Sequence, residues 1–254
     1  MRGLITAIRT LTLFPFPGRD AEKLSDSLPF FPLVGGFIGL LVAVTAWFIG
    51  GRYGWPMGAG VLCVVVSSFV TRGIHLDGLA DVFDSFGGQT VSRRLEIMKD
   101  PRIGSFGVVA LISVIMLKIT SIIRLASTGN YAFVVVPFII SRIMQVHLIV
   151  TLPYARAEGG TGAKFVDGAT MYHFVVAYLV GLMLCYAAGD ILAVLIGITA
   201  CLLCSILASW MRRTFGGVTG DLIGMASELF EAGVFIALCF NVYIPFAVQP
   251  AILS

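Results

Sequence analysis

The sequence predicts an all-α fold, a polytopic helical bundle that crosses a membrane about seven times. Hydrophobic residues make up 58% of the 254 residues and charged residues only 12%, whereas a soluble domain is about half apolar and a quarter charged. The mean hydropathy is +0.97. Several stretches approach the roughly 20 apolar residues that a helix needs to cross the hydrocarbon core. They are residues 30–50, 55–71, 105–127, 131–152, 171–188, 190–211 and 222–247.

The segment before the first span, residues 1–29, is expected to be cytoplasmic or interfacial. Leu4, Ile5, Ile8 and Leu11 share one helical face, which is typical of an amphipathic helix lying at the membrane surface. Arg9 interrupts the apolar run, so no cleavable signal is predicted.

Tight turns are predicted where small polar pairs separate two spans. Gly129-Asn130 and Gly189-Asp190 are such pairs, and each is expected to join an antiparallel helical hairpin. The sequence contains no internal repeat and no linker, which predicts a single domain over residues 1–254.

Lysine and arginine predict the orientation, because cytoplasmic loops of membrane proteins are enriched in them. If the segment after the second span is cytoplasmic, the N-terminus and segments 72–104, 152–170 and 211–221 share that side. Apart from Lys118 and Arg142, which lie inside spans, these segments hold every lysine and arginine except Arg52 and Arg124. Those two belong to the opposite side. Segment 72–104 is therefore predicted to face the cytoplasm, and the tail from about residue 248 the opposite side.

The remaining composition excludes some classes of function. A net charge of +3, with no basic run, gives no reason to expect a nucleic-acid partner. Cys201 and Cys204 form a CxxC, but without a second pair or a nearby histidine the cysteines are interpreted as small buried hydrophobic residues.

Several ionisable residues fall inside predicted spans, where charges are costly. They are Lys118, Arg142, His147, Glu228 and Glu231. One interpretation is an Arg142–Glu pair that locks helices together, or snorkelling of the side chains. The alternative is that Glu228 and Glu231, near the start of the last span, extend a polar site.

Three aspartates gather in the stretch HLDGLADVFDSFGG, residues 75–88. Asp77, Asp81 and Asp84 are spaced i, i+4 and i+7, so on a helix they share one face. Like charges this close need compensation, and Mg²⁺ supplies it by taking oxygen ligands and bridging to phosphates. The alternative is a solvated acidic helix start. His75 beside these acids is expected to have a raised pKa, so an orienting hydrogen bond suits it at least as well as a role as base.

Basic and glycine-rich segments follow. SRRLEIMKDPRIGSFG places Arg93, Arg94, Lys99 and Arg102 within ten residues. Orientation alone explains part of this cluster, but arginines beside a metal site are also what a polyphosphate substrate requires. Two further loops, YARAEGGTGAKF and RRTFGGVTGD, carry glycines whose backbone amides can approach phosphates. The second loop adds a fourth acid, Asp221, which could meet the Asp77 face.

Taken in order, FFPLVGGFIG, GIHLDGLADVFDSFGG, RLEIMKDPRIGSFG, LPYARAEGG and GGVTGDLIG resemble the cobalamin synthase family, the adenosylcobinamide-GDP ribazoletransferases. The resemblance covers nearly the whole chain. It implies a Mg²⁺-dependent transferase of the cell inner membrane with its active site on the cytoplasmic side. Its substrates would be adenosylcobinamide-GDP and α-ribazole or the 5′-phosphate, and its products adenosylcobalamin or its phosphate and GMP.

The resemblance, together with the residue chemistry, assigns roles to single positions. The expected catalytic residues are Asp77, Asp81, Asp84 and His75. The expected metal ligands are Asp77, Asp81, Asp84 and Asp221. The expected substrate-binding residues are Arg94, Lys99, Arg102, Arg156, Gly217 and Thr219. Many family members carry a small residue after the third acid, whereas this chain has Phe83 and Ser85 around Asp84, which predicts a bulkier wall but the same chemistry.

Two other functions are compatible with part of the sequence. A cation- or proton-coupled transporter would suit the spans and their charges, but transporters place their binding groups near the midplane on broken helices. A scaffold that recruits other cobalamin-assembly enzymes would not need the acids, and association with such enzymes is compatible with the transferase as well. The lipid bilayer is a partner in every case.

Overall fold

The computed structural model describes residues 1–241, and within that range the chain is built from helices with no strand. The elements in order are α1 (Arg2–Leu11), η1 (Leu24–Phe30), α2 (Phe31–Ala46), η2 (Trp47–Arg52), α3 (Pro56–Val70), α4 (Ile74–Asp84), η3 (Ser85–Gly87), α5 (Val91–Ile97), α6 (Ser105–Ser127), η4 (Tyr131–Val135), α7 (Val136–Thr151), α8 (Ala163–Val166), α9 (Met171–Phe215) and α10 (Gly220–Asn241). The predicted all-α fold is confirmed. The last part of the predicted span 222–247, and the tail from about 248, lie outside the described residues.

The helices are long and apolar enough for a multi-pass membrane protein. Within residues 1–241, five helices qualify as candidate spans, or six if α3 and α4 together form one. That number counts α9 once, although its backbone is not helical at Gly189 and Asp190. Counting the two halves of α9 separately adds one span. The total is then six or seven, depending on whether α3 and α4 are counted as a span, which agrees with the prediction of about seven.

The two halves of α9 form the predicted antiparallel hairpin. A Cβ built on Gly197 would lie 3.0 Å from a methyl group of Leu182. Fifteen residues of continuous helix would separate these positions by about 22 Å, so the chain reverses at Gly189-Asp190. Gly129 also makes its turn, with φ of +74°. There the hairpin prediction is only half right, because α10 lies between α6 and α7 and packs against both.

A sharp bend separates α3 from α4. The chain passes through Arg72 and Gly73, both with positive φ, and α4 then runs at 91° to α3. A helix perpendicular to a spanning helix lies along the membrane plane. In the bent pair, α3 therefore supplies the membrane-crossing part, and we treat α4 as lying outside the spanning segments.

The centre of the bundle is α7, which packs against α2, α9 and α10. All of its residues are buried except the last two, Val150 and Thr151, including the polar Ser141, Arg142 and Gln145. The glycines of FFPLVGGFIG allow α2 to approach it. A Cβ on Gly35 would stand 2.4 Å from the backbone oxygen of Phe138, and one on Gly39 would stand 2.8 Å from the Cα of Val135. This motif is a packing device of the small-xxx-small kind.

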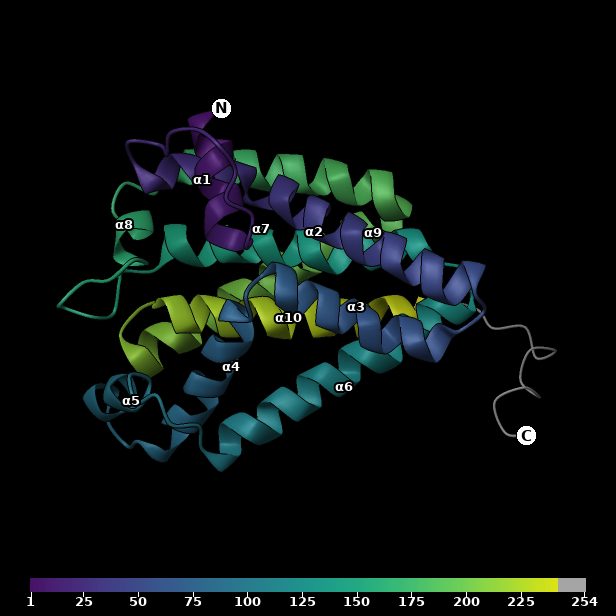
Figure 1. The fold of residues 1–254 in the computed structure, drawn as a ribbon. Helices are drawn as coiled ribbons and strands as arrows, with labels where there is room; N and C mark the ends of the chain where they lie inside the picture. Colours follow the sequence, from purple (N-terminus) through teal and green to yellow (C-terminus); the bar gives the residue numbers. More distant parts are fainter. Residues whose placement is uncertain (242–254) are drawn as a thin grey trace.

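One end of the bundle collects the short elements. Figure 1 shows α1, α5 and α8 at the same end of the long helices, and we call this the site end. Helix α1 forms as predicted, but Ile5, Ala7 and Leu11 are buried in the protein, with η1 and α2 as neighbours. Much of its apolar face is therefore covered by the protein as well as by any lipid surface.

Four of the five ionisable residues predicted inside spans form one buried network, whereas His147 lies beside Cys201 and Ser205 of α9. Lys118 Nζ lies 2.6 Å from Glu228 Oε2 and 2.5 Å from Glu231 Oε2, and Arg142 Nη1 lies 3.1 Å from Glu231 Oε1. These side chains come from α6, α7 and α10 and are at most 6% exposed. Two positive and two negative charges balance, which favours the helix-locking interpretation.

Candidate active site

The site is built where α4 crosses the start of α10. A Cβ on Gly78 would lie 2.6 Å from the backbone oxygen of Asp221 and 2.8 Å from its Cα, so only glycine permits this approach. The contact brings the fourth acid to the helix that carries the other three, although Asp221 is well over a hundred residues away along the chain. The sequence-based expectation that Asp221 meets the Asp77 face agrees with this geometry.

The acids differ in exposure. Asp77 is exposed, whereas Asp81 and Asp221 are half-buried. Burial first, and then the negative charges of Asp77 and the other acids, raise the pKa of Asp81 to about 7. The protein therefore holds carboxylates together at a cost to the ionised form, which is the condition that a bound cation relieves.

Asp84 is used differently from its neighbours. Its two carboxylate oxygens accept hydrogen bonds from the backbone N–H groups of Gly104 (2.7 Å) and Gly107 (2.8 Å). These are orphan donors at the start of α6, which a carboxylate satisfies well. Asp84 thus fastens α4 to α6, a role that the sequence analysis missed. The signal was the glycine pair in RIGSFG, because a Cβ at either glycine would collide with the carboxyl group.

His75 points into the protein and away from bulk solvent. Its Nε2 lies 3.0 Å from Gln145 Nε2, and the residue is 5% exposed. Burial first, and then the positive charges of Arg142 and Lys118, lower the pKa of His75 well below its usual range. The expected rise in its pKa is therefore wrong, because His75 faces the buried network more closely than the acids. The neutral ring is suited to an orienting hydrogen bond.

The three basic residues of the predicted phosphate cluster occupy different environments. Arg94 is committed to structure: its guanidinium donates to the backbone oxygens of Gly88 (2.9 Å) and Thr214 (3.1 Å) and lies over the ring of Phe215. Lys99 and Arg102, in contrast, form exposed ion pairs. Lys99 pairs with Glu158, and Arg102 makes a two-pronged contact to Asp100. Exposed pairs are weak, so a phosphate can replace these carboxylates.

The two glycine-bearing loops lie against each other. Val218 N–H donates to the backbone oxygen of Pro153, and Ala155 N–H donates to that of Val218. A Cβ on Gly217 would stand 2.1 Å from the Pro153 oxygen, so this glycine permits the loop pairing. Thr219 is fully buried, and its hydroxyl accepts from Leu222 N–H at 3.3 Å, which caps α10. The Thr219 hydroxyl is thus committed to the start of α10.

Arg156 is the residue of these loops that reaches the acids. Its Nη2 lies 2.7 Å from Asp221 Oδ2, and both side chains are largely buried. Its Nε is buried and has no hydrogen-bond partner in the described part of the chain. The arginine thus neutralises Asp221 at the edge of the acidic cluster.

Two of the four acids could serve as ligands of a hard divalent cation such as Mg²⁺. No group of three or more His, Cys, Asp or Glu side chains within residues 1–241 is arranged to hold a metal ion. Mg²⁺ does not require one, because it is usually bound by one or two carboxylates together with waters and substrate phosphates. Asp77 and Asp81 are the acids without a structural partner here, whereas Asp84 and Asp221 are engaged.

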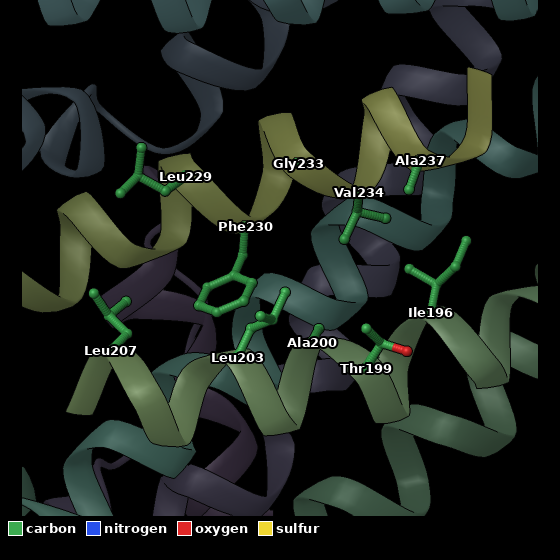
Figure 2. A pocket seen from close by; sticks show the side chains of 10 residues that line it. All are labelled: Ile196, Thr199, Ala200, Leu203, Leu207, Leu229, Phe230, Gly233, Val234 and Ala237. Carbon is green, nitrogen blue, oxygen red and sulfur yellow. The ribbon is translucent and has the colours of Figure 1, made fainter. Parts of the chain in front are cut away.

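A separate groove in the protein is lined almost entirely by apolar side chains and contains none of these acids. It lies between α10 and the second half of α9, and Figure 2 shows that Thr199 supplies the one side-chain oxygen among its labelled residues. A phosphate or metal ion finds no ligands in it. The chemistry therefore belongs to the site end.

Comparisons with known proteins identify the family of this chain. The family model described as cobalamin-5-phosphate synthase matches residues 3–239. A relative from Chlorobium phaeobacteroides (strain BS1) named adenosylcobinamide-GDP ribazoletransferase is 44% identical over 248 residues, which are 94% of this chain and 100% of the relative. Relatives with the same name from Chlorobaculum tepidum and Herpetosiphon aurantiacus are 42% and 38% identical and cover 93% and 91% of this chain and 94% and 93% of their own. No solved structure is similar.

These relatives carry the name of an enzyme, and they give no support to the transporter or scaffold interpretations. The similarity extends over the spans, the α4 acids and both glycine-bearing loops, so it includes every part of the site. This chain belongs to the cobalamin-5-phosphate synthase family of enzymes.

Proposed function

We propose that this protein joins adenosylcobinamide-GDP to α-ribazole, or to its 5′-phosphate, with release of GMP. The observation that carries the proposal is the meeting of Asp77 and Asp81 on α4 with Asp221 on α10, where Arg156 pairs with Asp221, in a chain of this family. The names of the relatives supply the substrates. Association with other cobalamin-assembly enzymes is compatible with this function.

The reaction forms one P–O bond and breaks another. The ribose 3′-hydroxyl oxygen of the acceptor attacks the phosphorus attached to cobinamide, and the bond from that phosphorus to GMP breaks. A carboxylate of the acidic cluster that is not bound to the metal accepts the hydroxyl proton. Lys99 and Arg102 bind the departing nucleotide, and neutral His75 orients neighbouring groups.

Mg²⁺ bound by Asp77 and Asp81 would neutralise charge on the diphosphate and stabilise the leaving phosphate. A reconstitution assay tests the proposed function directly. Purified protein in liposomes, given adenosylcobinamide-GDP and α-ribazole, should release GMP with Mg²⁺ and lose that activity with EDTA. GMP release unaffected by EDTA would remove the metal from the mechanism, and no release at all would refute the proposed transferase.

Replacing Gly78 with alanine should damage the site through packing. The new Cβ would displace the start of α10 from α4, and a shift of about 1 Å lowers turnover by roughly 100-fold. Overpacking should also lower the free energy of unfolding by about 1–3 kcal/mol. Thermal unfolding and GMP release measure the two effects. Gly87→Ala is the matched control, because a Cβ on Gly87 meets no atom within 4 Å; equal effects of both substitutions would contradict the packing account.

Arg102 is expected to select the nucleotide end of the donor. An arginine can bind two phosphate oxygens at once, whereas lysine offers a point charge. Arg102→Lys should therefore raise the KM for adenosylcobinamide-GDP, and Arg102→Ala should raise it further, by about tenfold or more for a lost charged hydrogen bond. The KM for α-ribazole should stay nearly constant.

Arg93 provides a matched control for that substitution. It is also exposed and paired with a nearby acid, Glu96, at 2.8 Å. It is not among the expected substrate-binding residues. Arg93→Ala should leave both KM values close to those of the wild type. A rise for α-ribazole alone in Arg102→Ala would assign the basic residues to the other substrate.

The site end is proposed to face the cytoplasm, because it carries the lysine- and arginine-rich segments. Cysteines introduced at Gln89 and at Tyr53, which are both exposed, test this orientation. An impermeant thiol reagent added outside cells should label the Tyr53→Cys variant, and label Gln89→Cys only after the membrane is opened. The reverse pattern would invert the topology.

A further inference from the structure

A second compartment adjoins the acids on the inner side of α4. It is a cavity of about 510 Å³ between α1, α4, α7, α8 and the start of α10. Asp77 and Asp221 form part of its wall, while His75 and Gln145 line it among buried residues. Phe31 and Phe165, whose rings meet edge to face at 6.0 Å, give it aromatic surface. The cavity thus connects the acidic cluster with a partly apolar interior.

The buried wall holds a polar atom with no partner. Gln145 is 1% exposed and its Nε2 lies 3.0 Å from His75 Nε2, but its Oε1 has no hydrogen-bond partner within residues 1–241. Leaving a buried acceptor unpaired is costly, and Gln145 lines the cavity, so a rotation of its amide toward the cavity would let a ligand hydroxyl supply the missing bond. If the amide nitrogen and oxygen of Gln145 exchange places, the oxygen faces His75 and the nitrogen is the atom left without a partner within residues 1–241.

We infer that this cavity is the acceptor subsite, which takes a nucleoside with a flat aromatic base and binds a ribose hydroxyl at the amide of Gln145. The inference rests on the proposed function. Cavities of about 300–1,000 Å³ hold molecules of this size, whereas the corrinoid of the donor is several times larger than a nucleoside. An acceptor whose 2′-hydroxyl is held by Gln145 brings its 3′-hydroxyl toward Asp77, where the phosphorus is attacked.

The guanosine of the donor is the rival occupant, and the charges disfavour it. Its leaving phosphate needs available cations, but the two arginines of this cavity are already engaged. Arg72 donates to the backbone oxygens of Arg9 and Thr10, and Arg9 donates to Phe16, Gly18 and Asp20. The weakly paired Lys99 and Arg102 are not among the residues that line the cavity.

Filling the cavity tests the assignment. Ile223 on α10 lines it and is half-buried, so Ile223→Trp should weaken binding of radiolabelled α-ribazole about tenfold or more, as measured by equilibrium dialysis without donor. Ile236→Trp is the matched control, since Ile236 is a half-buried residue of the same helix in a different pocket. Unchanged α-ribazole binding in Ile223→Trp, or a KM effect confined to adenosylcobinamide-GDP, would overturn the inference.

A ligand with one hydroxyl removed tests the role of Gln145. Wild-type protein should bind α-ribazole about tenfold more tightly than its 2′-deoxy analogue, and Gln145→Leu should bind the two equally. Damage to the fold alone would weaken both ligands and preserve their ratio, which would overturn the role of Gln145. Because binding needs no transfer, nucleoside binding that Ile223→Trp abolishes would support the subsite even if GMP release failed and refuted the proposed function.

Discussion

Asp81→Asn is expected to lower turnover by roughly 100-fold or more, comparable to the loss of a group that stabilises transition-state charge, and at the same time to stabilise the metal-free protein. The substitution keeps the shape of the side chain but removes its charge, and with it a proposed ligand of Mg²⁺. The stabilisation follows from the pKa of Asp81, which burial and the neighbouring acids raise from 3.8 to about 7. The same arrangement that suits catalysis is thus unfavourable for the resting protein.

The sign of the stability effect can be derived. A carboxyl whose pKa is higher in the folded protein than in the unfolded chain binds its proton more tightly when folded. Its stabilising contribution is therefore present at low pH and is lost as the pH rises through about 7. Asparagine resembles the neutral form, so the gain in unfolding temperature over the wild type should be larger at pH 8.5 than at pH 5.5, with EDTA present in both.

Asp84→Asn is the control for that experiment and should behave in the opposite way. Its carboxylate accepts two backbone N–H groups of α6, and an amide has only one oxygen to offer them. The unfolding temperature should fall, by an amount that corresponds to about 1–3 kcal/mol for a buried donor left unpaired. If Asp81→Asn lost stability as Asp84→Asn does, the two aspartates would share a structural role, and near-normal turnover at saturating Mg²⁺ would eliminate Asp81 as an essential group.

The spans could be predicted because they depend on composition and length. The predicted span 105–127 coincides with α6, and Gly189-Asp190 marks the break in α9. The bend before α4 depended on two residues with positive φ, Arg72 and Gly73. An arginine at such a position gives no signal in a single sequence, so the right angle between α3 and α4 was not foreseen.

Residue type identified the site but not the role of each member. Asp81 and Asp84 lie within one turn of the same helix, yet α6 engages only the second. Arg94 and Arg102 belong to one basic segment, and Arg94 is fastened to the end of α9 through the Thr214 oxygen. These differences arise from elements distant in sequence, which a local pattern cannot contain.

The buried network is the other place where a single change should have a large effect. Glu231 joins Lys118 on α6 to Arg142 on α7, and it is 2% exposed. Glu231→Gln leaves two buried positive charges with Glu228 as their remaining counter-charge. Removing one partner of a buried ion pair typically costs about 3–5 kcal/mol, so the unfolding temperature in detergent should fall markedly.

A double variant separates charge balance from packing. Lys118→Met combined with Glu231→Gln removes one charge of each sign and leaves Arg142 with Glu228, so it should be more stable than the sum of the two single variants predicts. If the network only locks helices, the folded fraction of each variant should keep near-normal KM and kcat for GMP release. Should Glu231→Gln instead keep its stability and lose turnover, the two glutamates would belong to the catalytic site. The contact of Ser141 with Glu231 (3.1 Å) and the packing of α10 against α6 and α7 support the lock, because every polar partner of Glu231 in the described chain comes from one of the helices that it holds together.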